Sequence, residues 1–272
     1  TMAPEIAELA KGLLREPVRV EASPPATTVT TIDQRVILAG SKAKRKAPFL
    51  VDLYRSALGK KYVMAITGIM IMGFVFAHMF GNLKMYLGPE DFNHYGHFLR
   101  ELAVPLLPRT WALWGLRLGL IVAFVLHIHA AYSLTMMNKR SNIKYQSKRD
   151  YVAVDFAGRT MRFTGVIFLL FLIWHLFDLT FTGTGFHYVR GDAYENVVGS
   201  LSRVPVAILY IVANLALGVH LFHGAWSLFQ SMGWNNPKFN GARRAFATAF
   251  AAIVVIGNVS FPIAVLAGIV DI

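Results

Sequence analysis

Five long stretches of mostly apolar residues follow one another along the chain, separated by short polar segments. Each stretch has the ~20 residues that an α-helix needs to cross a hydrocarbon core of ~30 Å. The pattern therefore predicts an all-α integral membrane protein with five transmembrane helices. The expected spans cover residues 62–86, 111–137, 162–183, 205–231 and 244–270.

The chain before the first span differs in character from the rest. Residues 1–47 are polar, include a stretch rich in proline and threonine, and end in a basic run. A segment of this composition buries too little apolar surface to fold alone. We therefore expect two parts: a polar N-terminal extension over residues 1–47, flexible or bound to a partner, and a membrane domain over residues 48–272.

The composition limits the chemistry that this chain can carry. Of its 272 residues, 55% are hydrophobic and 15% are charged, a balance typical of membrane proteins. The sequence has no cysteine, which excludes disulfides, iron–sulfur clusters and thiolate metal sites, so its nine histidines are the natural metal ligands. We expect no nucleic-acid partner despite the net charge of +12, because in membrane proteins the distribution of Lys and Arg between loops is what matters.

Lys and Arg are concentrated on one side of the predicted helices. Seven lie within residues 42–61 and seven within residues 139–162, whereas the other side holds three within residues 84–109 and two within residues 190–203. The positive-inside rule then places the N-terminus in the cytoplasm and, after five crossings, the C-terminus outside.

Histidines lie inside four of the five apolar runs. An ionisable residue at that depth is a functional-site hypothesis by default, and four helices with inward histidines are typical of a cofactor-binding bundle. The fifth helix has none, so we expect it to be peripheral to the first four. The candidates are His78, His127 with His129, His175, and His220 with His223.

The depths of these histidines suggest two pairs. At 1.5 Å per residue, His78 and His175 lie ~20 to 24 Å from the cytoplasmic side, whereas His127 and His220, on helices that run the other way, lie ~22 to 24 Å from the outer side. The first two thus share an outer level and the second two an inner level, ~12 to 18 Å apart along the membrane normal.

Two helices offer a choice of histidine. His127 has alanine four residues before and after it, and His220 lies between Ala216 and Gly224, so a helix leaves space beside both rings. His129 and His223 have larger neighbours at these offsets. We therefore favour His127 and His220 as the cofactor-facing residues, with His129 and His223 as supporting or packing residues.

The chemistry that needs such pairs is bis-histidine ligation of haem iron, in which each imidazole supplies one axial nitrogen. The alternative is that each ring simply bonds a neighbouring carbonyl or hydroxyl group. A histidine-lined transporter or proton channel is a second alternative. A transporter is expected to show internal repeats or broken helices, and we identify neither in the sequence.

Several motifs resemble one known family. They are HMFGNLKMY at 78–86, VLHIHAAYSLTMMN at 125–138, SKRDYV and GRTMRFTG near the third span, WHLFDLTF at 174–181, and HLFHGAWSLFQSMGWNN at 220–236. Together they resemble the single-chain, five-helix, di-haem cytochrome b membrane anchor of succinate dehydrogenase and fumarate reductase, over residues 54–270.

The resemblance implies a set of functional expectations. His78 and His175 would bind the distal of two b haems and His127 and His220 the proximal one, while no residue of this chain would be catalytic. The partners would be a flavoprotein subunit, an iron–sulfur subunit docked on the cytoplasmic loops, membrane lipid and a quinone, with menaquinone expected. The location would be the inner membrane of a bacterial cell. Another di-haem, quinone-reactive cytochrome b, such as that of a hydrogenase, stays open as an alternative.

Other polar residues near the helix ends have less definite roles. Arg117 and Asp178 both fall toward the outer face, where they could pair with each other, serve a haem propionate or quinone, or simply snorkel to the interface. Arg159 and Arg162 are candidates for propionate contacts or for a docking surface. We assign no role to His94, His97 and His187.

Overall fold

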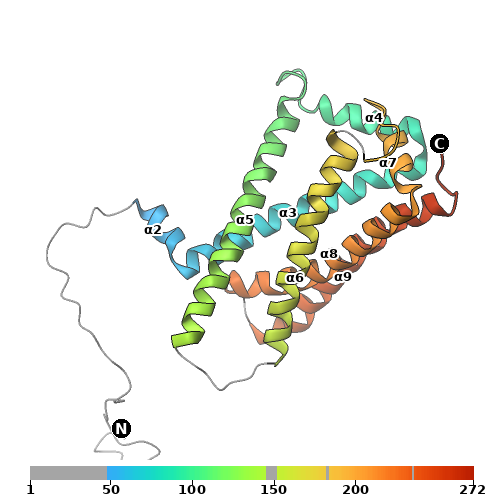
Figure 1. Ribbon diagram of the computed structural model, residues 1–272. Helices are drawn as coiled ribbons and strands as arrows, with labels where there is room; N and C mark the ends of the chain where they lie inside the picture. The colour runs from blue at the N-terminus through green and yellow to red at the C-terminus, as the bar shows by residue number, and fades with distance from the viewer. Residues whose placement is uncertain (1–47, 145–151, 182–183, 235) are drawn as a thin grey trace, which may run out of the picture. The chain divides into compact units, whose positions relative to one another are not determined.

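A computed structural model describes residues 48–144, 152–181, 184–234 and 236–272, with side chains for all of these except residues 50, 142–144 and 152–159. The extension predicted over residues 1–47 and part of the loop before the third span lie outside the described residues. The helices are α2 (Phe49–Arg55), α3 (Ala57–Asn82), η1 (Leu83–Leu87), α4 (Pro89–Arg100), α5 (Trp111–Lys144), α6 (Val152–Leu176), η2 (Phe177–Phe181), α7 (Ala193–Leu201), α8 (Val204–Ser231), η3 (Pro237–Phe239) and α9 (Asn240–Leu266) (Figure 1).

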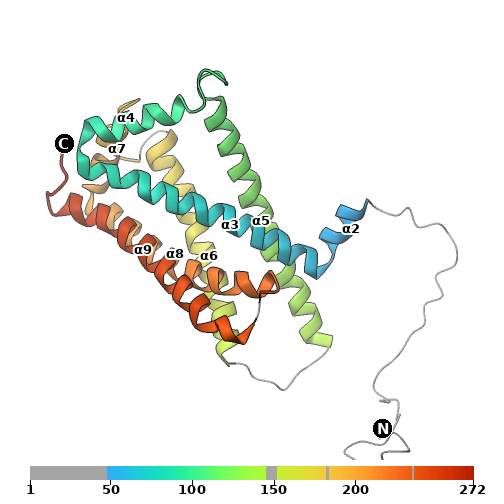
Figure 2. The same ribbon diagram turned by 180° about the vertical axis from the view of Figure 1, so that it is seen from behind.

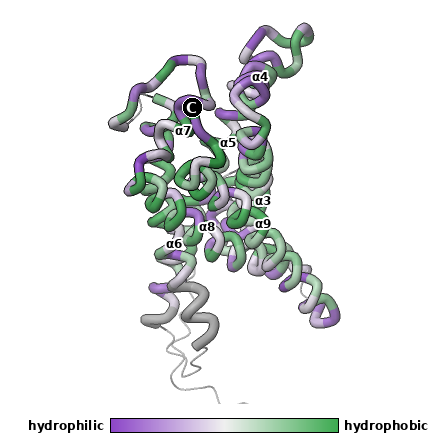
Figure 3. Tube along the Cα trace, turned by 90° about the vertical axis from the view of Figure 1, so that its right-hand side faces the viewer, coloured by the Kyte–Doolittle hydropathy of each residue, from purple (hydrophilic) through white to green (hydrophobic). Residues whose placement is uncertain are grey.

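Five stretches of these helices are long and apolar enough to cross a membrane, which confirms the predicted all-α membrane fold. They cover Ala57–Leu87, Trp111–Ser141, Thr160–Phe181, Val204–Ser231 and Pro237–Leu266. Figure 3 shows that the long helices are mostly hydrophobic along their length. Many of their large apolar side chains are exposed, as expected for surfaces that face lipid.

The first spanning helix begins earlier than predicted because its first turn is capped. The Ser56 side chain accepts a hydrogen bond from the backbone N–H of Gly59 at 2.9 Å, which satisfies one of the free donors at the start of α3. Lys60, which we had placed outside the helix, lies within this turn and donates to the carbonyl oxygens of Tyr54 and Arg55. A lysine at a helix end can thus stay inside the span.

The spanning helices pack as two antiparallel pairs. α3 lies against α5, α6 lies against α8, and the two pairs meet chiefly where α3 passes α8 (Figures 1 and 2). We call α3 with α5 the first half and α6 with α8 the second half. α9 lies along α8 and also touches α3, and it carries no histidine.

The contact between α8 and α9 depends on small residues. A Cβ atom built on Gly218 of α8 would lie 2.3 Å from Cγ2 of Val255 on α9, so the two backbones approach to a distance that only glycine permits. Small residues at helix contacts are the usual way to pack helices closely in lipid, where apolar burial alone provides no driving force. Gly218 therefore sets the spacing between these two helices.

One end of the membrane domain, the end that holds the C-terminus, is covered by the short helices α4 and α7 (Figures 1 and 2). Asn93 joins them, since its side chain donates to Asp192 at 3.0 Å and accepts from the backbone N–H groups of Ala193 and Tyr194. Asp192 also caps α7 by accepting from Glu195 N–H. We did not predict either helix from the sequence, because each is too short to produce a long apolar run.

We expect Gly218→Ala to destabilise the membrane domain. The added methyl group meets Val255, whose β-branched side chain cannot turn away easily, so α8 and α9 must separate at a cost of about 1–3 kcal/mol. The measurement is the midpoint of thermal unfolding in detergent. Gly241→Ala on α9 is the matched control, because a Cβ there meets nothing within 4 Å. Equal midpoints for the two variants would contradict this account of the helix contact.

Candidate functional site

The structure brings His78 and His175 together. His78 on α3 and His175 at the end of α6 have ring centroids 5.9 Å apart, with their planes inclined at 50°. His78 lies edge-on to Phe74, and His175 stacks on Phe171. We call these two residues the outer pair, and their proximity is the one expected from the depth of each residue in its helix.

His127 on α5 and His220 on α8 form the second set, which we call the inner pair. These two rings lie near enough to interact electrostatically. Each rests against a glycine of a neighbouring helix: a Cβ on Gly68 would lie 3.5 Å from Cε1 of His127, and a Cβ on Gly165 would lie 3.4 Å from Cε1 of His220. A larger residue at either glycine would displace the ring.

The inner histidines have matching hydrogen-bond partners on Nδ1. Nδ1 of His127 lies 3.2 Å from both the Met64 carbonyl oxygen and the Thr67 hydroxyl. Nδ1 of His220 lies 3.3 Å from the Thr164 hydroxyl and also bonds the Met161 backbone. Because a carbonyl oxygen only accepts, Nδ1 carries the proton in both rings, which leaves Nε2 as the free lone pair.

The outer histidines are also bonded through Nδ1. The Asn82 amide lies 2.8 Å from Nδ1 of His78, and the Tyr210 hydroxyl lies 3.1 Å from Nδ1 of His175. An amide can accept through its oxygen, and oxygen and nitrogen exchange places by a half turn of the group. In all four histidines Nδ1 is therefore hydrogen-bonded to the protein. Such a bond is what holds a metal-binding imidazole in position.

The Thr67 and Thr164 contacts reveal an internal repeat. The pattern M-x2-T-G-x9-H occurs once on α3, from Met64 to His78, and once on α6, from Met161 to His175. In each copy the Met-Thr-Gly segment supports an inner histidine of the partner helix, and the closing histidine belongs to the outer pair. We did not identify this short repeat in the sequence, because the two copies share only five residues, the four of the pattern and Phe74 with Phe171.

The repeat also fixes the separation of the two pairs. Thr67 touches His127, and His78 lies 11 residues further along the same helix; Thr164 and His175 have the same spacing on α6. Eleven helical residues span about 16 Å, which lies within the separation expected from the sequence.

His129 and His223 lie elsewhere. The ring of His129 stacks on Tyr54, and its Nδ1 lies 2.5 Å from the Tyr54 hydroxyl, so it faces the segment before α3. His223 lies edge-on to Phe222. His223 also lies near enough to His220 to interact with it electrostatically. The choice of His127 and His220 stays a prediction.

The number of ligands limits what these pairs can hold. Among the described residues, no group of three or more His, Asp or Glu side chains gathers as a metal site. Two imidazoles alone suit a metal that brings its other ligands with it, as haem iron does in its macrocycle. The ring centroids of the outer pair lie 5.9 Å apart, which leaves room for one metal atom that both imidazoles would bind, so His78 and His175 could hold such a group.

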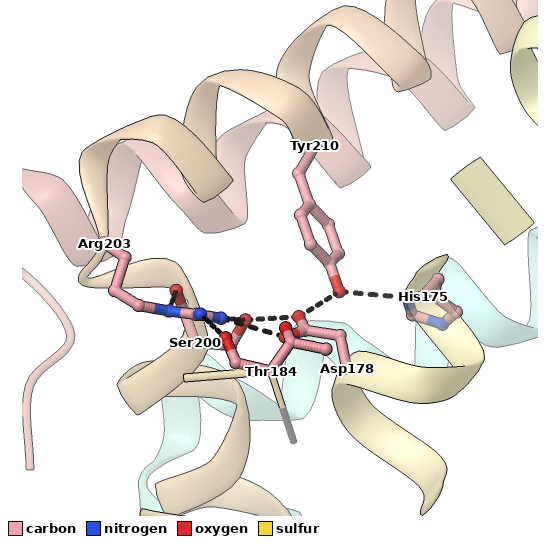
Figure 4. A network of polar contacts seen from close by, with 6 residues as sticks. All are labelled: His175, Asp178, Thr184, Ser200, Arg203 and Tyr210. Atoms are coloured by element: carbon pink, nitrogen blue, oxygen red, sulfur yellow. Dashed lines mark hydrogen bonds and ion pairs between the residues drawn. The ribbon is translucent and has the colours of Figure 1, made fainter. Parts of the chain in front are cut away.

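A buried polar network adjoins the outer pair (Figure 4). Asp178, in the π-helical turn η2, is fully buried and pairs with Arg203 at 2.9 Å. Its carboxylate also accepts from Ser200 at 2.5 Å, from Thr184, and from the Tyr210 hydroxyl at 2.9 Å. Tyr210 in turn bonds His175, so the network connects a buried charge to the outer pair.

This network corrects one expectation. We considered a pair between Arg117 and Asp178, but the partner of Asp178 is Arg203, at the start of α8. Arg117 is exposed on α5 and lies over the ring of Trp114. We had counted Arg203 only as a loop cation, although an acidic residue inside a span is itself a signal that a cation lies nearby. Arg162 is exposed, and the Arg159 side chain is outside the described residues.

Comparison with known proteins agrees with the resemblance seen in the sequence. Residues 159–259 match the family model of the succinate dehydrogenase/fumarate reductase transmembrane subunit. The chain is also 26% identical over 173 residues to the succinate dehydrogenase cytochrome b558 subunit of Bacillus subtilis (strain 168), which covers 62% of this chain and 77% of that protein. No solved structure matches the chain. The two matches confirm the resemblance.

We expect Asp178→Ala to lower the free energy of unfolding by about 3 kcal/mol or more, because it leaves the partly buried Arg203 without its counter-ion. Arg117→Ala should change it by less than about 0.5 kcal/mol, as for an exposed side chain outside any network. Thermal or denaturant unfolding in detergent compares the two. A loss of stability in Arg117→Ala that matched the loss in Asp178→Ala would argue against Arg203 as the partner.

Proposed function

Starting from its resemblance to the transmembrane subunits of succinate dehydrogenase and fumarate reductase, we propose that this chain anchors such an enzyme to the membrane. In this role it carries electrons from an iron–sulfur subunit to a membrane quinone, with menaquinone as the expected quinone. The observation that carries the proposal is that four histidines lie as two pairs at two levels, and two of them, His175 and His220, lie within the family match.

The residues that would hold the cofactors are His78 and His175 at one level and His127 and His220 at the other. Two b haems bound there would supply one-electron carriers at both levels. The chain's own contribution is to fix the imidazoles. Thr67, Thr164, Asn82 and Tyr210 engage Nδ1 of each ring, so Nε2 is left to face the partner histidine.

The orientation in the membrane follows from the charges. With the N-terminus in the cytoplasm, the inner pair lies nearer the basic loops, where an iron–sulfur subunit would dock, and the end covered by α4 and α7 faces outward. We propose the inner membrane of a bacterial cell as the location. A docking surface before α3 and over residues 138–162 is consistent with this, although residues 145–151 lie outside the described part.

We expect two low-spin b haems per chain in the purified complex. Replacing His78 or His175 by alanine should remove one, and replacing His127 or His220 should remove the other, because each iron loses one axial ligand. Pyridine haemochrome quantitation together with the reduced-minus-oxidised optical spectrum measures this. Fewer than two haems in the intact protein would contradict the cofactor assignment.

His129→Ala and His223→Ala are the matched controls for these substitutions. Both residues are histidines on the same two helices, but His129 faces Tyr54 and His223 faces Phe222. Both variants should retain two haems. Loss of a haem in His129→Ala, with both kept in His127→Ala, would reverse the assignment on α5.

The electron-transfer role predicts that the chain copurifies with a flavoprotein and an iron–sulfur subunit, and that the complex reduces a menaquinone analogue with succinate. His175→Ala should lower this activity, provided that the complex still assembles with its inner haem. Full activity in that variant would remove the outer pair from the electron path. Copurification with hydrogenase or formate dehydrogenase subunits would instead favour the other class of di-haem cytochrome.

A further inference from the structure

The four histidines differ in the groups to which their Nδ1 atoms are hydrogen-bonded. Among the described residues, the groups bonded to Nδ1 of His127 and His220 are neutral: backbone carbonyls and threonine hydroxyls. Behind His78 there is a neutral amide. Behind His175 there is the Tyr210 hydroxyl, which is itself bonded to the buried carboxylate of Asp178. One imidazole of the four is thus linked to a charge.

The direction of these hydrogen bonds can be worked out from the donors present. Asp178 is fully buried and is paired with Arg203, so its carboxylate is an acceptor. The Tyr210 hydroxyl has one proton, which it donates to Asp178 at 2.9 Å. It must therefore accept from Nδ1–H of His175 at 3.1 Å. The chain of bonds runs from His175 to Tyr210 to Asp178.

Such a chain makes an imidazole a stronger electron donor to a metal. A hydrogen bond from Nδ1–H to an acceptor raises the basicity of a ligating histidine, and a carboxylate behind the acceptor polarises the hydroxyl further. A more basic axial ligand stabilises the oxidised iron relative to the reduced iron. The low dielectric of a membrane interior screens this interaction weakly, although the charge of Arg203 beside Asp178 opposes part of it.

We propose that Tyr210 and Asp178 are positioning residues that lower the reduction potential of the outer haem, through His175 and without touching the cofactor. This inference rests on the proposed function, because it requires an iron held between His78 and His175. Arg203 pairs with Asp178, and Ser200 and Thr184 donate hydrogen bonds to its carboxylate. The inner pair has no such link and should not respond to changes in this network.

The decisive variant is Tyr210→Phe, which removes one hydroxyl and leaves the Asp178–Arg203 ion pair in place. We expect the outer haem to titrate at a higher potential, with its oxidised-to-reduced ratio at a given potential changed about tenfold, or about 59 mV for one electron. The inner haem should titrate as in the unaltered protein. The measurement is an optical redox titration of the intact complex, with the outer component assigned as the one lost in His175→Ala.

Tyr194→Phe is the matched control. Tyr194 is buried in the same apolar cluster as Tyr210, but its hydroxyl donates to the Asp271 backbone carbonyl. The Tyr194→Phe variant should leave the reduction potentials of both haems unchanged. If Tyr210→Phe does not assemble, the double variant Asp178→Asn with Arg203→Gln removes the charge without leaving either partner unpaired, and it should raise the same potential.

The outcomes separate this inference from the proposed function. A complex without two haems would overturn the proposed function. Two haems with an outer potential that is unchanged in Tyr210→Phe, or in the double variant, would overturn the inference alone. Equal shifts of both haems would also overturn it, because they would show a general loosening of the domain and not an effect transmitted through His175.

Discussion

The hydrogen bond to Nδ1 of each buried histidine is the interaction on which the site depends. Lipid offers no water to a buried imidazole, so each ring must find its partner within the protein. Met64 and Thr67 serve His127, and Tyr210 serves His175. In these two rings the bonds make Nδ1 the protonated ring atom and leave the Nε2 lone pair free.

The two copies of the M-x2-T-G-x9-H pattern show how one helix serves two levels. On α3 the Thr-Gly step supports His127, and three turns later the same helix supplies His78. α6 does the same for His220 and His175. The supporting residues and the outer histidines therefore move as rigid units, because an α-helix fixes the distance between them. A shift of either helix would disturb both levels together.

Most of the fold could be predicted from the sequence, because apolar length alone identifies a membrane-spanning helix. The pairing of His78 with His175 was also accessible, since helix direction and depth depend on residue number. The partner of Asp178 was not accessible, because Arg203 comes close only through the turn at η2 and the start of α8. α4 and α7 were not predicted because each is too short to produce a long apolar run, and their contact depends on Asn93, which joins segments about a hundred residues apart.

Each histidine pair takes one member from each half of the bundle. His78 and His127 belong to the first half, and His175 and His220 belong to the second. The halves otherwise touch chiefly where α3 passes α8. Any group that binds both members of a pair is thereby coupled to docking of the halves, since a ligand stabilises the state that binds it by mass action. Filling of the site and docking of the halves would then favour each other, and a separated half would have at most half of each binding site.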